Sequence, residues 1–293
     1  MLTFIYEEWV NKIDCENLPP IIDVRGIPYD ILKLFEDTTL KSLLAYSPLP
    51  NRLTFSFLGY AIKRKMVELV EEKGICYIKL KSEYRPKNIR IDEEKLEKGI
   101  IWAKKFYKEI VKNPKGEYYQ DLRDEYPKTY HEQYLRGLFS GEHFPYISNY
   151  KYLVVGDDEG KSLALYKITQ GQVDITVADI DERIPKLIRE KIPKIKTKVI
   201  DTRLLRNKVW DKFDVVISYS LLNSQLNTLK DFLIGATKDY GIVYMSMYPA
   251  LFKKVEDIFT IWKFFTDWGF WITHFTPYFV RMVKIPELKK VDN

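Results

Sequence analysis

The sequence has few of the residues that build metal centres and disulfide frameworks. It contains two cysteines, Cys15 and Cys76, and three histidines among 293 residues. Two cysteines are too few for a disulfide framework or a cysteine-based zinc site, and the histidines have no metal-ligand spacing. We therefore expect no bound metal.

Long hydrophobic runs and low-complexity segments are also missing. No apolar stretch reaches the roughly 18 residues that a membrane span needs, and the N-terminus carries acids where a signal peptide is basic and then apolar. With 13 Gly, 14 Pro and 46% hydrophobic residues, the composition excludes collagen-like and largely disordered chains. We expect a cytoplasmic globular protein of about two domains, away from the membrane.

The net charge is +6, from 47 basic and 41 acidic residues, and it is concentrated near the N-terminus. Residues 52–90 hold ten Lys or Arg against four Glu, so the rest of the chain is neutral overall. A solvated basic face is the commoner reason for such a cluster, and a polyanionic partner is the alternative.

The N-terminal region, residues 1–91, has the pattern of a winged-helix-like domain. Apolar spacing predicts helices at 27–37, 39–47 and 53–74, the last closed by Gly74. Residues 75–86 then alternate as a strand does. Helix, turn, helix and strand is the order of a winged helix.

The third predicted helix could serve in either of two ways. In a DNA-binding domain it would enter the major groove, and Lys63, Arg64 and Lys65 would lie on or near its exposed side. The apolar residues Phe55 and Phe57 on the same helix favour instead a docking role within the protein. We favour docking and keep nucleic acid as a possible partner.

Residues 92–149 connect this region to the next one. Residues 92–112 predict an amphipathic helix. Residues 113–149 combine Pro and Gly with eight Tyr or Phe, which we interpret as an irregular segment that packs over a neighbouring site.

From residue 150 to 286, predicted strands alternate with predicted helices. Two closely spaced strands, at 270–275 and 278–285, end the pattern as a hairpin. Parallel strands with crossover helices followed by an antiparallel hairpin predict an α/β, doubly wound, Rossmann-like sheet of the methyltransferase type. Residues 287–293 form a tail.

Acidic residues follow three successive predicted strands, where a doubly wound sheet binds its ligand. We expect Asp179 to accept hydrogen bonds from the two hydroxyls of a ribose and Asp201 to lie near adenine or the substrate. The alternative is that some of these acids only cap the next helix. The ligand-binding candidates are Gly156, Asp157, Asp158, Glu159, Asp179, Asp181 and Asp201.

The first of these turns lacks the spacing G-x-G-x-x-G, so a pyrophosphate cofactor is disfavoured. Three acids at 157–159 would also repel the carboxylate of S-adenosylmethionine. Decarboxylated S-adenosylmethionine and a polyamine are cationic, and they suit an acidic loop.

Two segments, VVGDDEGKSLAL at 154–165 and VADIDERIPKLI at 177–188, resemble the branched-chain polyamine synthases, also called bis(aminopropyl)spermidine synthases. Residues 156–158 match the first loop of that family, Glu159 replaces its last Asp, and residues 179–183 match its second motif. The resemblance implies a homodimer that transfers an aminopropyl group from decarboxylated S-adenosylmethionine to a linear polyamine. It places Asp158, Glu159 and Tyr130 at the reaction, and Tyr134, Ser218 and Tyr219 against the substrate.

The chain departs from that family at two motifs. Tyr130, His131 and Glu132 stand where the family has Tyr-Asp-Gln, and residues 218–221 read Ser-Tyr-Ser-Leu where it has Asp-Pro-Pro-Tyr. Two alternatives therefore stay open: a catalytically inactive paralogue that binds DNA or protein, and an S-adenosylmethionine-dependent methyltransferase. Abundant Lys, Ile and Glu with few Gln fit a thermophile.

Overall fold

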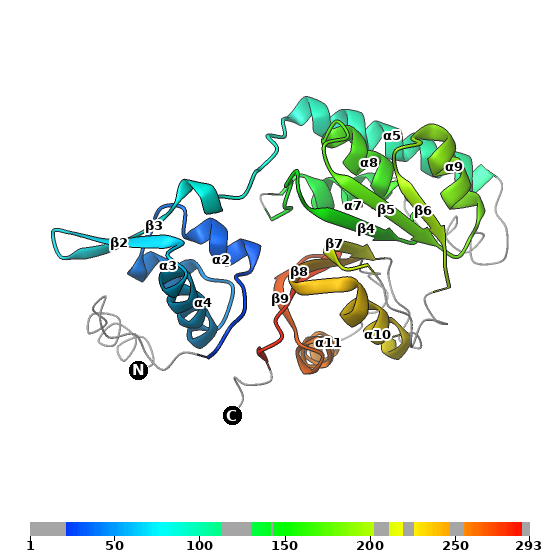
Figure 1. Cartoon of the computed structure of the whole chain (residues 1–293). Helices are drawn as coiled ribbons and strands as arrows, with labels where there is room; N and C mark the ends of the chain where they lie inside the picture. Colours follow the sequence, from blue (N-terminus) through cyan, green and yellow to red (C-terminus); the bar gives the residue numbers. More distant parts are fainter. Residues whose placement is uncertain are drawn as a thin grey trace.

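The computed structural model describes residues 22–112, 130–141, 143–201, 211–218, 226–246 and 255–288. Two units are visible in Figure 1, and the long helix α5 lies on the C-terminal one. Of the predicted tail at 287–293, Glu287 and Leu288 are buried, and residues 289–293 lie outside the described residues.

The N-terminal unit combines three helices with a small antiparallel sheet of order β1-β3-β2. Buried leucines and phenylalanines of the helices, among them Leu43, Phe55 and Phe57, form its core. Its elements are α2 (Tyr29–Leu34), β1 (Thr38–Thr39), α3 (Leu40–Tyr46), α4 (Asn51–Lys63), β2 (Val67–Glu72), β3 (Ile75–Leu80) and the short helix η1 (Ser82–Tyr84).

The third helix of this unit is shorter than its apolar spacing predicts. It ends at Lys63, Lys65 adopts a left-handed φ of 57°, and Val67–Glu72 pairs as a strand with β3. The prediction of a helix as far as Gly74 was therefore wrong. The sequence VELVEE fits both a helical and an alternating pattern, and pairing with β3 selects the strand. Gly74, at φ 75°, lies in the hairpin turn.

Two helices lie in the chain between the N-terminal unit and the first strand of the C-terminal sheet. The predicted helix at 92–112 is confirmed as α5 (Glu93–Lys112). The prediction of an irregular 113–149 was wrong for α7 (Tyr130–Phe139), and residues 113–129 lie outside the described part. The buried face of α7 combines aromatic residues with leucines, because Tyr134, Leu135, Leu138 and Phe139 are buried at helical spacing.

The C-terminal unit is a seven-stranded sheet of order β6-β5-β4-β7-β8-β10-β9. The first five strands in this order are parallel, and β10 is antiparallel to both of its neighbours. This order confirms the predicted Rossmann-like, methyltransferase-type sheet ending in a hairpin. Its elements are β4 (Lys151–Val155), α8 (Lys161–Ile168), β5 (Asp174–Asp179), α9 (Arg183–Lys191), β6 (Lys196–Val199), β7 (Phe213–Ser218), α10 (Leu226–Ala236), β8 (Thr237–Ser246), α11 (Val255–Asp267), β9 (Phe270–Phe275) and β10 (Phe279–Lys284).

Helices cover both faces of this sheet. Figure 1 shows α5, α8 and α9 on one side and α10 and α11 on the other. Along β4, Tyr152 and Val154 belong to the core on the first side, and Leu153 and Val155 to the core on the second. A strand buried on both faces explains the continuous apolar run in the sequence.

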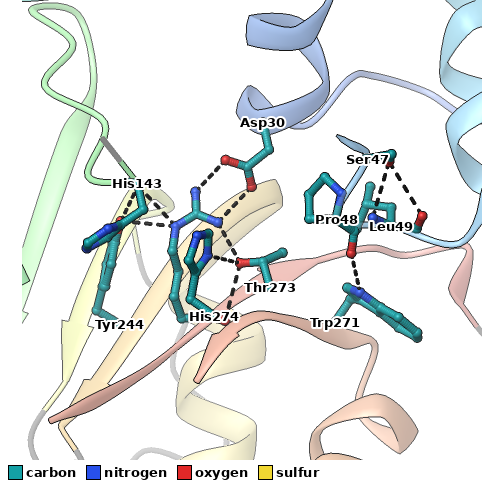
Figure 2. A network of polar contacts seen from close by, with 10 residues as sticks. Asp30, Ser47, Pro48, Leu49, His143, Tyr244, Trp271, Thr273 and His274 are labelled. Carbon is teal, nitrogen blue, oxygen red and sulfur yellow. Dashed lines mark hydrogen bonds and ion pairs between the residues drawn. The ribbon is translucent and has the colours of Figure 1, made fainter. Parts of the chain in front are cut away.

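The two units share one core and a polar interface. The buried residues of the N-terminal helices belong to the same apolar cluster as those of α5 and α8. Across the interface, the Asp30 carboxylate forms two hydrogen bonds of 2.7 Å with the fully buried Arg281 guanidinium. The Trp271 indole N–H donates to the carbonyl of Pro48 at 2.8 Å (Figure 2).

Candidate functional site

The site is organised by the loop between β4 and α8. Gly156 and Gly160 have φ of 64° and 73°, values that favour glycine, so the chain turns sharply between them. A Cβ on Gly160 would lie 3.0 Å from the Cα of Ala103 in α5. The three acids at 157–159 therefore lie at the carboxyl end of β4. Because β4 lies between β5 and β7, this is the topological switch point of the sheet, where ligands bind in such folds.

Asp157 caps the following helix. It is fully buried, and its carboxylate accepts hydrogen bonds from the backbone N–H of Ser162, at 3.2 and 3.3 Å, and from the Ser162 hydroxyl. The helix-capping role that the sequence left open therefore describes this carboxylate.

Asp179 links the first loop to the end of β5. One of its oxygens accepts the backbone N–H of Asp157 at 2.8 Å, and the other accepts that of Asp181 at 2.9 Å. The side chain is 5% exposed, and burial raises its pKa. A carboxylate has about four acceptor sites, so these two bonds leave capacity for two ribose hydroxyls.

Asp181 and Asp201 have different surroundings. The Asp181 carboxylate forms an ion pair with the Arg183 guanidinium and accepts the backbone N–H of Arg183 at 3.0 Å. This pairing directs it to the start of α9. Asp201 follows β6, and the neighbouring Ile200 N–H donates to the carbonyl of Asp179 at 2.7 Å, which brings this segment beside β5.

Lys161, the first residue of α8, is the charged group that the sequence analysis overlooked. Its side chain is fully buried, and its ammonium lies 2.8 Å from the Glu159 carboxylate. Burial lowers the pKa of Lys161, but Glu159, Tyr134 and the neighbouring aspartates outweigh this effect and raise it. A lysine at the positive end of a helix dipole is unfavourable, and that position was the available signal.

The acids of the loop carry less negative charge than the sequence suggests. Burial raises the pKa of Asp157 to about 7. Burial and then the Glu159 carboxylate raise the pKa of Asp158 to about 8. Lys161 pairs with the third acid, Glu159, so the loop carries less negative charge at pH 7 than three ionised acids would. The charge argument for a cationic ligand is therefore weaker than the sequence suggests, and the choice of donor stays a prediction.

Side chains of α5 and α7 form a wall next to this loop. The His131 ring stacks on Tyr107 with centroids 4.4 Å apart, and its Nε2 lies 2.9 Å from the carbonyl oxygen of Glu159. Because a carbonyl only accepts, this nitrogen carries the proton. Burial lowers the pKa of His131. Tyr130, expected at the reaction, begins α7, and its side chain is outside the described part.

Tyr134 connects α7 to the carboxyl ends of β7 and β8. Its hydroxyl and that of Ser246 are 2.6 Å apart, and the Ser246 hydroxyl donates to the carbonyl of Ser218 at 3.3 Å. Ser246 thus links Tyr134 to Ser218, while their expected position against the substrate stays a prediction. The Ser218 hydroxyl is buried without a partner among the described residues. Tyr219 lies outside those residues.

The basic residues of the N-terminal unit are separate from this site. Lys63, Arg64 and Lys65 are exposed at the end of α4, whereas the middle of that helix, residues 53–58, is buried.

Two kinds of feature do not occur in the part of the chain that the structure describes. No three or more His, Cys, Asp or Glu are grouped so as to hold a metal ion. No helix combines the length and the apolar character that crossing a membrane requires.

Comparisons with known proteins give only distant likenesses. No family model and no curated protein matches the sequence. Human N-acetylserotonin methyltransferase, solved in complex with SAM, is 12% identical over 87% of this chain and 91% of its own, with a TM-score of 0.38. A putative RNA methyltransferase from Pyrococcus horikoshii is 15% identical over 63% of this chain and 96% of its own, with a TM-score of 0.40.

A third solved structure is the fibrillarin pre-rRNA processing protein of Methanococcus jannaschii. It is 15% identical over 47% of this chain and 67% of its own, with a TM-score of 0.39. Because the sequence identities and TM-scores are this low, the fold is established by the strand order of the sheet and not by these solved structures.

Proposed function

We propose that this protein binds S-adenosylmethionine at the carboxyl ends of β4, β5 and β7 and transfers its methyl group to an acceptor. The observation that carries the proposal is the placement of Asp179, whose carboxylate is held against the glycine-flanked loop at the switch point of the sheet. Rossmann-like sheets bind their nucleosides at this place, with an acid on the ribose.

The residues of the site fit an S-adenosyl nucleoside. Positive φ at Gly156 and Gly160 allows close backbone approach, and the Ser218 hydroxyl is a buried polar group with no described partner. When bound, the nucleoside supplies an electrophilic methyl carbon on a sulfonium. The nucleophile of the acceptor forms a bond to that carbon while the carbon–sulfur bond breaks and its electron pair goes to sulfur.

The reduced negative charge of the loop favours the methyl donor over its decarboxylated form. A carboxylate on the donor is repelled by ionised acids and tolerated by acids that are protonated or paired. At neutral pH Asp158, with its pKa raised to about 8, is mostly protonated, Asp157, with its pKa raised to about 7, is partly protonated, and Glu159 is paired with Lys161. Aminopropyl transfer, implied by the sequence resemblance, is therefore our second proposal, supported by the motif at 179–183.

Titration calorimetry with S-adenosylmethionine, S-adenosylhomocysteine and decarboxylated S-adenosylmethionine tests the proposal. We expect the wild type to bind the first two, and Asp179→Asn to weaken both about 10-fold to 100-fold, because charge-assisted hydrogen bonds contribute roughly 1.5–3 kcal/mol. Asp174→Asn is the matched control, since Asp174 begins the same strand and pairs with Lys196.

Either of two outcomes would contradict the proposal: no binding of S-adenosylmethionine to the folded wild type, or equal binding by both variants. Thermal denaturation of each variant verifies that it is folded. Preference for the decarboxylated donor would favour aminopropyl transfer.

We further propose that the N-terminal unit is a winged helix with a docking role. The order helix, strand, helix, helix, strand, strand supports the first part. The buried middle of α4 supports the second, because six consecutive buried residues, 53–58, leave that part of the helix no exposed face that could enter a DNA groove. Fluorescence anisotropy with duplex DNA tests it: salt-dependent affinity that drops in Lys63→Glu would argue for DNA binding instead.

A further inference from the structure

The proposed donor site contains a charged group that neither ribose binding nor methyl transfer requires. Lys161 begins α8, its side chain is fully buried, and its ammonium lies 2.8 Å from Glu159. Burying an ammonium is costly, and placing it at the N-terminus of a helix adds to the cost. A compensating interaction must therefore hold it there.

The compensation comes from acidic and phenolic groups on several elements. The loop contributes carboxyl groups, β5 contributes another, and α7 and α5 contribute aromatic side chains. The groups that act electrostatically on Lys161 or on its partner acids are Asp157, Asp158 and Glu159 of the loop, Asp179 of β5, His131 and Tyr134 of α7, and Tyr107 of α5.

We propose that Lys161 determines donor specificity: its ammonium cancels the charge of Glu159, so that the site accepts a donor bearing a carboxylate, S-adenosylmethionine, over its decarboxylated form. This inference rests on the proposed function. Lys161 acts through the field at the loop and is a specificity-determining residue, with no step of the methyl transfer assigned to it.

The protonation of the neighbouring aspartates predicts that this donor preference depends on pH. With the pKa of Asp157 near 7 and that of Asp158 near 8, both become ionised as the pH rises from about 6 to 9. The loop then gains negative charge that a single lysine does not cancel. Preference for the carboxylate-bearing donor should therefore decrease over this pH range.

Two substitutions move the charge of the loop in opposite directions. Lys161→Met keeps an unbranched stem and removes the positive charge, and Glu159→Gln removes the negative one. The double variant restores neutrality. Lys167→Met is the control, because Lys167 is on the same helix but lies over Trp102, 3.6 Å from its ring centre.

The readout is the ratio of the Kd for S-adenosylmethionine to the Kd for the decarboxylated donor, measured by calorimetry at pH 7. We expect Lys161→Met to raise this ratio on the order of tenfold, Glu159→Gln to lower it by a similar factor, and the double variant and the control to keep the wild-type value. Glu159→Gln keeps the test valid if Lys161→Met does not fold.

A wild type that binds S-adenosylmethionine but whose ratio is unchanged in the folded variants would overturn only this inference. A wild type that binds neither donor would overturn the proposed function together with it.

Discussion

Asp158 illustrates how burial changes what a residue type implies. Its neighbours in sequence, Asp157 and Glu159, suggest a strongly negative loop, and the inference of a cationic ligand depended on that charge. In the structure the pKa of Asp158 is raised to about 8, first by burial and then by Glu159. The ion pair between the buried Lys161 and Glu159 could not be recognised from the sequence, because burial of a single side chain depends on tertiary packing.

The same residue predicts how stability depends on pH. An aspartate whose pKa rises on folding keeps its proton in the folded state where the unfolded chain releases it, so the free energy of unfolding decreases as pH rises from about 4 to 8. We expect Asp158→Asn to flatten this slope and to raise the Tm at pH 9 by several degrees. Thermal denaturation between pH 5 and 9 checks this, with exposed Asp231→Asn as the control.

A higher wild-type Tm at pH 9 than at pH 6, with Asp158→Asn unchanged from wild type, would mean that Asp158 is ionised in the folded protein.

At the scale of elements, apolar patterns in the sequence predict many of the strands and helices, but not the features that depend on tertiary packing. The strands of the C-terminal sheet were predicted because continuous apolar runs such as KYLVV mark strands buried on both faces. The sequence was misleading for β2, where VELVEE fits two periodicities, and for α7, whose aromatic face looked irregular. The strand pattern correctly placed Asp179 at the end of a strand. The wall formed by Tyr107 and His131 could not be predicted, because it depends on how α5 and α7 pack against each other.

Gly160 tests how the site loop is fixed to α5. Its φ is 73°, and a Cβ there would lie 3.0 Å from the Cα of Ala103. We expect Gly160→Ala to lower the free energy of unfolding by about 1–3 kcal/mol, from backbone strain and this close approach. Gly235→Ala is the control, because no atom lies within 4 Å of its added Cβ and it is in helix α10. That variant should be neutral or slightly stabilising.

Chemical denaturation provides the measurement. Equal stability of the two alanine variants would show that the loop relaxes and that Gly160 does not fix it to α5.

At the scale of the whole molecule, a buried ion pair joins the two units. Figure 2 shows Asp30 of the N-terminal unit at the edge of a polar network that also includes Tyr244, His143 and Thr273. The Arg281 guanidinium in this network donates to Asp30, to Thr273 at 2.6 Å and to the carbonyl of His143 at 3.1 Å. The sequence could not predict a pair separated by 251 residues.

Removing one partner of this pair should be costly. Asp30→Ala leaves a buried guanidinium without its carboxylate, and we expect a loss of about 3–5 kcal/mol in the free energy of unfolding. The double variant Asp30→Ala with Arg281→Met should recover part of that loss. Lys263→Ala, which breaks an exposed pair with Asp267 on α11, should change stability by less than about 0.5 kcal/mol. Urea denaturation monitored by tryptophan fluorescence measures all three, and similar effects of Asp30→Ala and Lys263→Ala would show that the interface pair is not needed.

A crystal structure of the protein with S-adenosylhomocysteine would locate the nucleoside and so decide where this molecule binds its donor. We expect the ribose hydroxyls within hydrogen-bonding distance of the Asp179 carboxylate and the amino-acid part of the ligand beside the loop from Gly156 to Gly160. A ligand bound elsewhere, or crystals grown at saturating ligand that show no nucleoside at the carboxyl ends of β4 and β5, would contradict the assignment of this site.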